Sequence, residues 1–455
     1  MRKTIYIALA CTLMLSSCGT YKKYHRPEVN TEGIYRDVTT TDTTTLGSTP
    51  WREVFTDPLL QALIDKALNN NVDLLTAALS VKQAKDMLTV AKLAFVPGFV
   101  FAPNGTISSW DKGKASQVYS LPVEASWTVD LFGSLLNAKR GQQAVLIQAQ
   151  DYQRAVRSSI ISGVANCYYT LLMLDKQLEI TLGTEKLTQQ TYDMMLQQKK
   201  YSVGVDESAV QSARANNLAV QASIPELKRQ IRETENALSL LLAEAPQAIQ
   251  RGKLEAQSLP EKLSTGVGIQ VLGNRPDVHA KEMALAKCFY DVNRARSSFY
   301  PSITITGRAA WTNSGGMGIV NPGKLLATAV GSLVQPIFQH GQLVAQLRVA
   351  KSQQEAAYLA WQQSVLNAGS EVSNALALYE TSEKRSQLEA EQVAALESNV
   401  DVAQKLFKTS ANYNYLNVIS AQSSLLQAQL SKVADDFKKM QAVVNLYYAL
   451  GGGSN

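Results

Sequence analysis

The chain has 455 residues and a formal net charge of +6, from 44 basic and 38 acidic side chains. The charges are spread thinly without a basic stripe, which argues against a nucleic-acid partner. Its four cysteines and three histidines show neither CxxC nor HExxH spacing, so the composition offers no disulfide framework and no metal motif.

The N-terminus has the pattern of an exported protein. A basic start precedes an apolar run over residues 5–15, which suits a signal peptide and is too short to span a bilayer as a helix. The following Leu-Ser-Ser-Cys-Gly at residues 15–19 resembles the lipobox of bacterial lipoproteins. We therefore expect a signal peptide over residues 1–17 and covalent diacylglycerol and N-acyl lipid at Cys18. An ordinary signal peptide with a chance cysteine is the alternative, and Gly19 in place of aspartate favours outer-membrane sorting by the same resemblance.

A threonine-rich stretch from Thr31 to Pro50 predicts an extended segment, and we expect this lipid-anchored region to cover residues 18–55. The first helix is expected to begin at Thr56-Asp57-Pro58, with Thr56 as the N-cap. Its apolar stripe continues without a clear break until Pro97-Gly98.

Two later segments predict unusually long helices. No proline occurs between Lys139 and Lys200, which allows a rod of roughly 90 Å. In the second half, one stripe of apolar or small residues recurs at helical spacing: Leu343, Leu347, Ala350, Ala357, Trp361, Val365, Ala368, Val372, Leu376 and Tyr379. The stripe predicts one buried helix face. A coiled coil or helical bundle has the same periodicity, so that alternative stays open.

Between the helices the period changes to the alternation of strands. We expect four strands in two hairpins, at about 98–108, 118–132, 302–312 and 326–338, with the first strand interrupted by Pro103-Asn104-Gly105. Three of the five tryptophans lie in or beside them, which favours a membrane interface for Trp110, Trp127 and Trp311, with core packing as the alternative. Four strands cannot close a membrane barrel, so membrane strands would require an oligomer.

The second half of the sequence repeats the first. Phe95-Val96-Pro97 recurs as Phe299-Tyr300-Pro301, and Val164-Ala165-Asn166 recurs as Val372-Ser373-Asn374. We therefore expect one elongated body with an internal duplication, in place of the domain count that length alone suggests. The expected boundaries are 56–245 for the first repeat, 246–273 for a linker, 274–450 for the second repeat and 451–455 for a flexible tail.

Four groups of residues carry a more specific resemblance. They are Asp57-Pro58-Leu59-Leu60 with Ala67-Leu68 and Asn71, Trp-Thr-Val-Asp-Leu-Phe-Gly at 127–133, Asn-Arg-Pro-Asp-Val at 274–278, and Gln-Pro-Ile-Phe at 335–338. Together they resemble the TolC superfamily of outer-membrane efflux lipoproteins, the exit ducts of tripartite resistance-nodulation-division pumps.

The resemblance implies a mainly α protein with membrane β structure. Three copies would each contribute four strands to a twelve-stranded β-barrel and long antiparallel helices to a periplasmic α-barrel. It further implies a periplasmic membrane-fusion adaptor and an inner-membrane resistance-nodulation-division pump as partners, with passive conduction of small molecules by this chain.

The same resemblance places two helix-to-helix tips near residues 201–206 and 407–413. It implies adaptor docking at Val203, Gly204, Val205, Asp206, Ser410 and Asn412. Gate candidates are Tyr413, Tyr415, Asn417 and Ser420. Several relatives carry aspartates at the positions of Asn417 and Ser420, so the family's acidic ring is missing here. Gly204 also suits a simple helix end.

Two other functions remain as alternatives: a duct for type I protein secretion, and a lipid-anchored periplasmic helical scaffold. We expect no catalytic residues, no metal site and no cofactor other than the lipid. The sequence does not indicate the exported substrate, and it assigns no role to Cys167 or Cys288.

Overall fold

The computed structural model describes residues 23–28, 45–109, 111, 113–201, 205–258, 275–313, 324–409 and 415–454. It forms two compact units. The first is made of residues 1–29, 78–151 and 279–364, and the second of residues 30–77, 152–278 and 365–455. Each unit therefore contains segments from both halves of the sequence, so both repeats contribute to both units.

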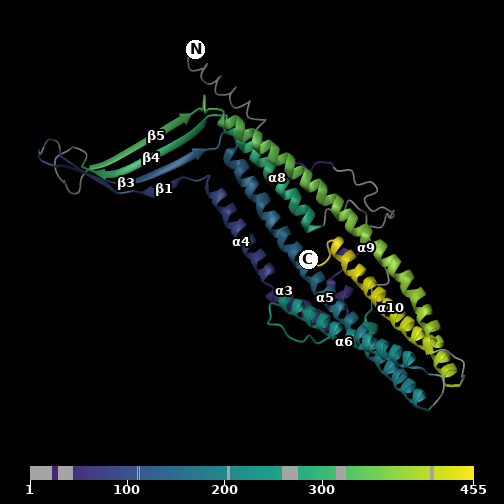
Figure 1. Cartoon of the computed structure of the whole chain (residues 1–455). Coiled ribbons are helices and arrows are strands. Elements are labelled where there is room, and N and C mark those ends of the chain that lie inside the picture. The colour runs from purple at the N-terminus through teal and green to yellow at the C-terminus, as the bar shows by residue number, and fades with distance from the viewer. Residues whose placement is uncertain are drawn as a thin grey trace. The chain divides into compact units, whose positions relative to one another are not determined.

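Most of the described chain is helical (Figure 1). The helices are α2 (Trp51–Val54), α3 (Pro58–Asn70), α4 (Val72–Leu93), α5 (Ser134–Tyr201), α6 (Glu207–Leu241), α8 (Pro276–Ser297), α9 (Gln342–Thr409) and α10 (Tyr415–Ala449), with 3-10 turns η2 (Leu46–Ser48) and η3 (Leu254–Ala256). Helices α5 and α9 both have 68 residues, and α6 and α10 both have 35. The duplication is thus confirmed as two helix pairs of equal length. The described helices contain no apolar stretch of the length needed to cross a membrane.

The start of the helical region differs from the expectation in two ways. The N-cap of α3 is Asp57, whose carboxylate accepts a hydrogen bond from Leu59 N at 2.9 Å, so the prediction of Thr56 was wrong. The single expected helix is also interrupted at Asn71. The Asn71 side chain accepts from Asp73 N at 2.9 Å, which starts α4, and donates to Leu241 O at 3.0 Å. This long-range bond holds the break in place.

The predicted stripe of α9 is confirmed as a buried face. All ten of its residues are buried or half-buried, and Ala368 and Val372 are fully buried. Its three alanines, Ala350, Ala357 and Ala368, leave room for a neighbouring helix beside the larger side chains of the stripe.

The first unit contains a single antiparallel sheet. Its strands are β1 (Gly98–Phe101), β2 (Asn104–Ser108), β3 (Ser116–Val129), β4 (Ser302–Thr312) and β5 (Lys324–Val334). Their order is β1-β3-β4-β5, and β2 pairs with β3 beside β1. Figure 1 shows β3, β4 and β5 running side by side as long arrows. The two expected hairpins are thus joined into one sheet by the pairing of β3 with β4.

The ends of two strands were predicted wrongly, whereas the expected interruption of the first strand is confirmed. The first expected strand is divided into β1 and β2 around Pro103, which cannot donate to a ladder. Strand β3 ends at Val129, because the Asp130 carboxylate accepts from Leu135 N and Leu136 N at the start of α5, at 3.0 and 2.7 Å. Strand β5 ends at Val334 and a turn with positive φ at His340 and Gly341 follows.

The core of the second unit packs the N-terminal segment against the end of the chain. Phe55 and Tyr447 make an edge-to-face contact with centroids 5.7 Å apart, and Leu46 is buried beside them. The extended segment expected before residue 56 therefore joins the core at its C-terminal end. Residues 451–453 are buried, whereas we expected a flexible tail. A Cβ on Gly452 would lie 2.4 Å from the Tyr447 ring, so this close packing requires glycine.

Candidate channel surfaces and helix tips

One face of the sheet is apolar and exposed. The register places Leu121 opposite Trp311 and Trp127 opposite Ile305, with all four side chains on this face. At the outer strands of the same face, Phe99 is 72% exposed and Ile107 is 74% exposed. Water would not favour such a continuous apolar surface, whereas the hydrocarbon of a bilayer would.

The two described tryptophans of the sheet lie near opposite ends of this apolar face. Trp127 is level with Ile305 and Trp311 lies six residues further along β4, about 20 Å away. Aromatic girdles flank an apolar band of comparable height in membrane β proteins. Trp110 lies outside the described residues, and the interface role of all three stays a prediction.

Both edges of the sheet end without a further strand among the described residues. Strand β5 pairs only with β4 on its inner side, and β1 and β2 pair only with β3. An unpaired edge exposes a row of backbone N–H and C=O groups, which is costly in lipid. The sheet is therefore incomplete as a membrane structure in a single copy.

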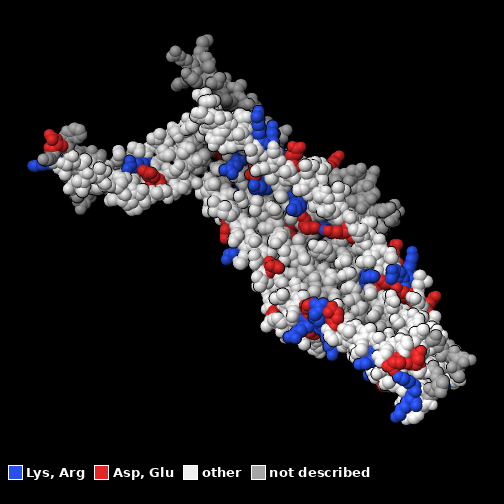
Figure 2. Space-filling model, viewed as in Figure 1, with Lys and Arg blue, Asp and Glu red and all other residues white. Residues whose placement is uncertain are grey.

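The opposite face of the sheet is polar along β3 and β4, whereas β5 exposes Leu326, Val330 and Val334 on it. Serine and threonine side chains predominate there, and it carries one close pair of opposite charges, Glu124 and Arg308. Figure 2 shows basic and acidic groups intermingled over the helices and few of them over the strands. Sequence reasoning missed the pair, although single charges inside uncharged strands were a usable signal.

A small apolar cluster joins four helix ends in the second unit. It contains Met195 of α5, Val210 of α6, Phe407 of α9 and Val418 of α10. The helix ends that flank the two predicted tips thus lie together, because residues of both helix pairs pack into one cluster. This arrangement supports a common helical tip built from the two halves of the repeat.

The docking candidates are only partly described. Asp206 is exposed and caps α6 by accepting from Ala209 N at 2.8 Å, and Val205 is half-buried against the tip cluster. The neighbouring Glu207 pairs with Lys199 at the end of α5. Val203, Gly204, Ser410 and Asn412 lie outside the described residues, so docking at this tip stays a prediction.

The gate candidates separate into two kinds. Asn417 and Ser420 are exposed, and their spacing of three places them on one side of the first turns of α10. Tyr415 is half-buried and packs against the tip cluster, which gives it a structural contact. Tyr413 lies outside the described residues, and the gating role of all four residues stays a prediction.

Buried polar groups link the helices just behind the tip cluster. Gln422 of α10 donates to Thr191 Oγ1 of α5 at 3.0 Å. Asn217 of α6 accepts from Thr188 Oγ1 at 2.9 Å and donates to Gln189 Oε1 at 2.6 Å. Buried hydrogen bonds of this kind fix which positions face each other, because a shift along the helix would leave them unpaired.

The segment Arg275-Pro276-Asp277 begins α8, as expected, and also makes a buried contact. Arg275 is 3% exposed and contacts Asp277 at 2.6 Å, Glu371 at 2.6 Å and the carbonyl of Ala449 at 3.1 Å. Burial alone would raise the pKa of Asp277, but the hydrogen bonds and charge of Arg275 hold it below its ordinary value. The motif therefore ties the start of α8 to α9 and to the end of α10.

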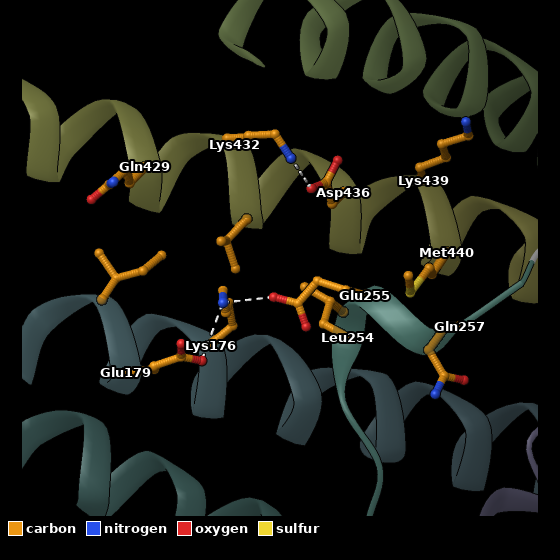
Figure 3. A pocket seen from close by; sticks show the side chains of 12 residues that line it. Lys176, Glu179, Leu254, Glu255, Gln257, Gln429, Lys432, Asp436, Lys439 and Met440 are labelled. Carbon is orange, nitrogen blue, oxygen red and sulfur yellow. Dashed lines mark hydrogen bonds and ion pairs between the residues drawn. The ribbon is translucent and has the colours of Figure 1, made fainter. Parts of the chain in front are cut away.

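The second unit has a pocket of about 630 Å³ between α5, η3 and α10 (Figure 3). Lys176 contacts Glu255 at 2.6 Å, and Lys432 contacts Asp436 at 2.7 Å. Lys439 is paired with Glu383 at 2.9 Å. Because these charges neutralise each other, the pocket offers no unmatched charge for a ligand, and we assign none to it.

The described part of the chain brings no three metal-ligating side chains together. Cys167 and Cys288 are free and half-buried, and burial raises the pKa of both thiols. His279 forms a side-chain hydrogen bond with Asp151 at 2.6 Å. Cys18 lies outside the described residues, so lipidation there stays a prediction.

Comparison with known proteins agrees with this geometry. The family model described as "Outer membrane efflux protein" matches residues 63–244 and 268–452. Among curated proteins, the probable outer membrane lipoprotein SilC of Salmonella typhimurium is 26% identical over 457 residues, covering 99% of this chain and 97% of that protein. The toluene efflux pump outer membrane protein TtgC of Pseudomonas putida is 26% identical over 477 residues, covering 100% of this chain and 96% of that protein.

Among solved structures, the open state of the Neisseria gonorrhoeae outer membrane channel MtrE aligns with a TM-score of 0.86 and 26% identity. The alignment covers 95% of this chain and 98% of that one. The match therefore includes both the sheet and the long helices.

Proposed function

Because this chain belongs to the outer membrane efflux protein family, we propose that three copies of it assemble into the exit duct of a tripartite efflux system. The chain is an outer-membrane channel of the TolC superfamily, mainly helical, with strands for a membrane β-barrel. Each copy would contribute four strands to a twelve-stranded barrel, where β1 and β2 together count as one strand.

The two-faced sheet with unpaired edges is the observation that carries the trimer proposal. Its apolar face suits contact with lipid, and its polar face suits a water-filled interior. Pairing of β5 with the first strands of a neighbouring copy would satisfy both edges at once, since each copy has one of each. A closed ring of copies leaves no edge exposed to lipid.

Substrate would enter the duct through the helical tip. A periplasmic membrane-fusion adaptor and an inner-membrane resistance-nodulation-division pump are the partners that we infer, by relation to efflux-pump proteins such as TtgC. The pump would supply the energy, so this chain would conduct passively and needs no catalytic residue. Acylation of Cys18 would anchor the N-terminal segment in the same membrane, as the lipoprotein relative SilC suggests.

The proposal is tested with full-length protein extracted from outer membranes in mild detergent. We expect a trimer by light scattering, and single-channel conductance when it is added to planar bilayers. A water-soluble monomer without conductance would support the periplasmic scaffold instead and reject the duct.

A further inference from the structure

Charged residues are almost absent from the five described strands. Apart from Lys324 at the first position of β5, they contain only Glu124 in β3 and Arg308 in β4. These two residues face each other directly in the register between β3 and β4. Two opposite charges at one level of an uncharged sheet require an explanation.

Glu124 and Arg308 form a loose ion pair whose side chains are partly exposed. Arg308 Nε lies 3.3 Å from Glu124 Oε1, and Arg308 Nη2 donates to Ser120 Oγ at 3.1 Å. The Arg308 Nε atom is itself buried and has no partner with hydrogen-bond geometry in the described part of the protein, so the exposure of Arg308 lies in the rest of its side chain. The Arg308 and Glu124 side chains remain 40% and 52% exposed. Both charges are therefore accessible to ions and solutes on their side of the sheet.

The pair lies on the polar face. Alternation along β3 puts Glu124 on the same face as Ser126 and Thr128, opposite to Trp127, and Arg308 is on the same face as Thr306. A charged side chain placed in hydrocarbon is strongly unfavourable, most of all at the bilayer midplane. The pair is thus compatible with the membrane only if this face meets water.

We propose that Glu124 and Arg308 of all copies form a charged belt inside the membrane part of the duct, and that this belt controls its ion selectivity. The proposal rests on the proposed function, because it needs the polar face to line a water-filled channel. Each copy contributes one positive and one negative charge, so the belt has no net charge and the intact duct should discriminate little between small anions and cations. Removing one partner leaves one unbalanced charge in each copy.

The first test measures reversal potentials of single channels under a KCl gradient. Arg308→Gln should raise the cation-to-anion permeability ratio by about twofold or more, and Glu124→Gln should lower it by a similar factor, because rings of like charge select ions. The double variant and the exchanged pair Glu124→Arg with Arg308→Glu should both remain close to the wild type. The single-variant effects should shrink in about 1 M salt, where the Debye length falls to about 3 Å.

The second test does not depend on the conductance of the tip. Arg308→Cys and its neighbour Ala309→Cys are compared in a Cys167→Ala, Cys288→Ala background, with a charged, membrane-impermeant thiol reagent applied to intact outer membranes. Position 308 should react and position 309, on the apolar face, should not. The background protein without an added cysteine is the control, and the trimer band is checked for each variant.

The outcomes separate the belt from the duct. Equal labelling at both positions, or unchanged selectivity in both single variants of a conducting wild type, rejects the belt and leaves the channel function standing. Absence of conductance from wild-type trimers rejects the proposed function and the belt with it.

Discussion

Ala243 and Gly451 occupy the same position at the ends of two repeat-related helices, α6 and α10. Both have positive φ, 57° and 79°, and both stand where a helix ends in the left-handed conformation. At each helix end, the following residue donates its backbone N–H to the carbonyl five residues earlier. Glu244 N donates to Ser239 O, and Gly452 N donates to Tyr447 O, both at 2.9 Å. The duplication has therefore preserved the helix ending while the residue type differs between the halves.

This difference predicts opposite effects of two substitutions. Alanine in the left-handed region costs about 1 to 2 kcal/mol that glycine does not, offset in part by the greater unfolded-state entropy of glycine. Ala243→Gly should stabilise the protein by about 0.5 kcal/mol, whereas Gly451→Ala should destabilise it by about 1 kcal/mol. Both changes are measured as shifts in the thermal unfolding midpoint of the detergent-solubilised protein. Equal shifts of the same sign would contradict the strain argument.

The long helices could be predicted from the sequence because their signals are local. Period, lack of proline and the repeat together predicted α5 and α9, and Pro276 predicted the start of α8. The break at Asn71 could not be found in this way, since it depends on a hydrogen bond to Leu241, which is 170 residues away in the chain.

The site was predictable only in outline. Alternation predicted the strands, but their ends depend on Asp130, which caps the next helix and thereby ends β3. Residues near the tips were placed by the repeat, yet the burial of Tyr415 depends on packing between both helix pairs. The Glu124–Arg308 pair was missed because these two residues, 184 apart in the chain, become neighbours only when the two hairpins join.

The buried contact of Arg275 predicts a graded loss of stability. Arg275→Met removes the hydrogen bonds to Asp277, Glu371 and the Ala449 carbonyl. Because Asp277 and Glu371 are 42% and 47% exposed and can be hydrated, we expect a cost of about 1.5 to 3 kcal/mol. Arg275→Lys keeps the positive charge but loses the planar guanidinium group. Its stability should therefore lie between those of the wild type and Arg275→Met. Chemical denaturation monitored by tryptophan fluorescence measures the free energy of unfolding of the wild type and both variants. A lysine variant less stable than the methionine variant would contradict this account.

The buried polar groups behind the tip predict unequal effects of two similar substitutions. Gln422 is 2% exposed, and its Oε1 has no hydrogen-bond partner among the residues that the structure places. Gln422→Leu removes this unpaired acceptor and also the hydrogen bond to Thr191, whose hydroxyl still donates to Leu187 O at 2.9 Å, so the net effect should be close to zero. Asn217→Leu removes two hydrogen bonds, those with Thr188 and Gln189, although the Thr188 hydroxyl keeps its bond to Glu185 O, and it should cost about 1 to 3 kcal/mol. Thermal unfolding compares the two leucine variants directly, and the reverse order would show that the polar groups do not control this packing.

The bond between His279 and Asp151 predicts a specific pH dependence. It raises the pKa of His279 above 6.5, with further attraction from Glu282 and opposition from burial and from Arg26. A raised folded-state pKa means that the stabilisation is complete below pH 6.5 and is lost as the pH rises through the folded value. As the pH rises from 6.5 through the folded-state pKa of His279, the unfolding midpoint of the wild type should therefore fall relative to that of His279→Gln. Parallel pH profiles of the two proteins would exclude a contribution from this pair.

Lipidation and barrel assembly should be separable at Cys18. Cys18→Ala removes the thiol that would accept lipid, so incorporation of labelled palmitate in growing cells should be lost. Trimers should still form, because the apolar face and the strand edges that we propose to pair are built from residues 98–129 and 302–334. Cys167→Ala is the matched control and should keep the label, since that thiol is half-buried within α5. Label retained in Cys18→Ala would place the lipid elsewhere, whereas loss of trimers together with the label would show that the anchor is needed for assembly.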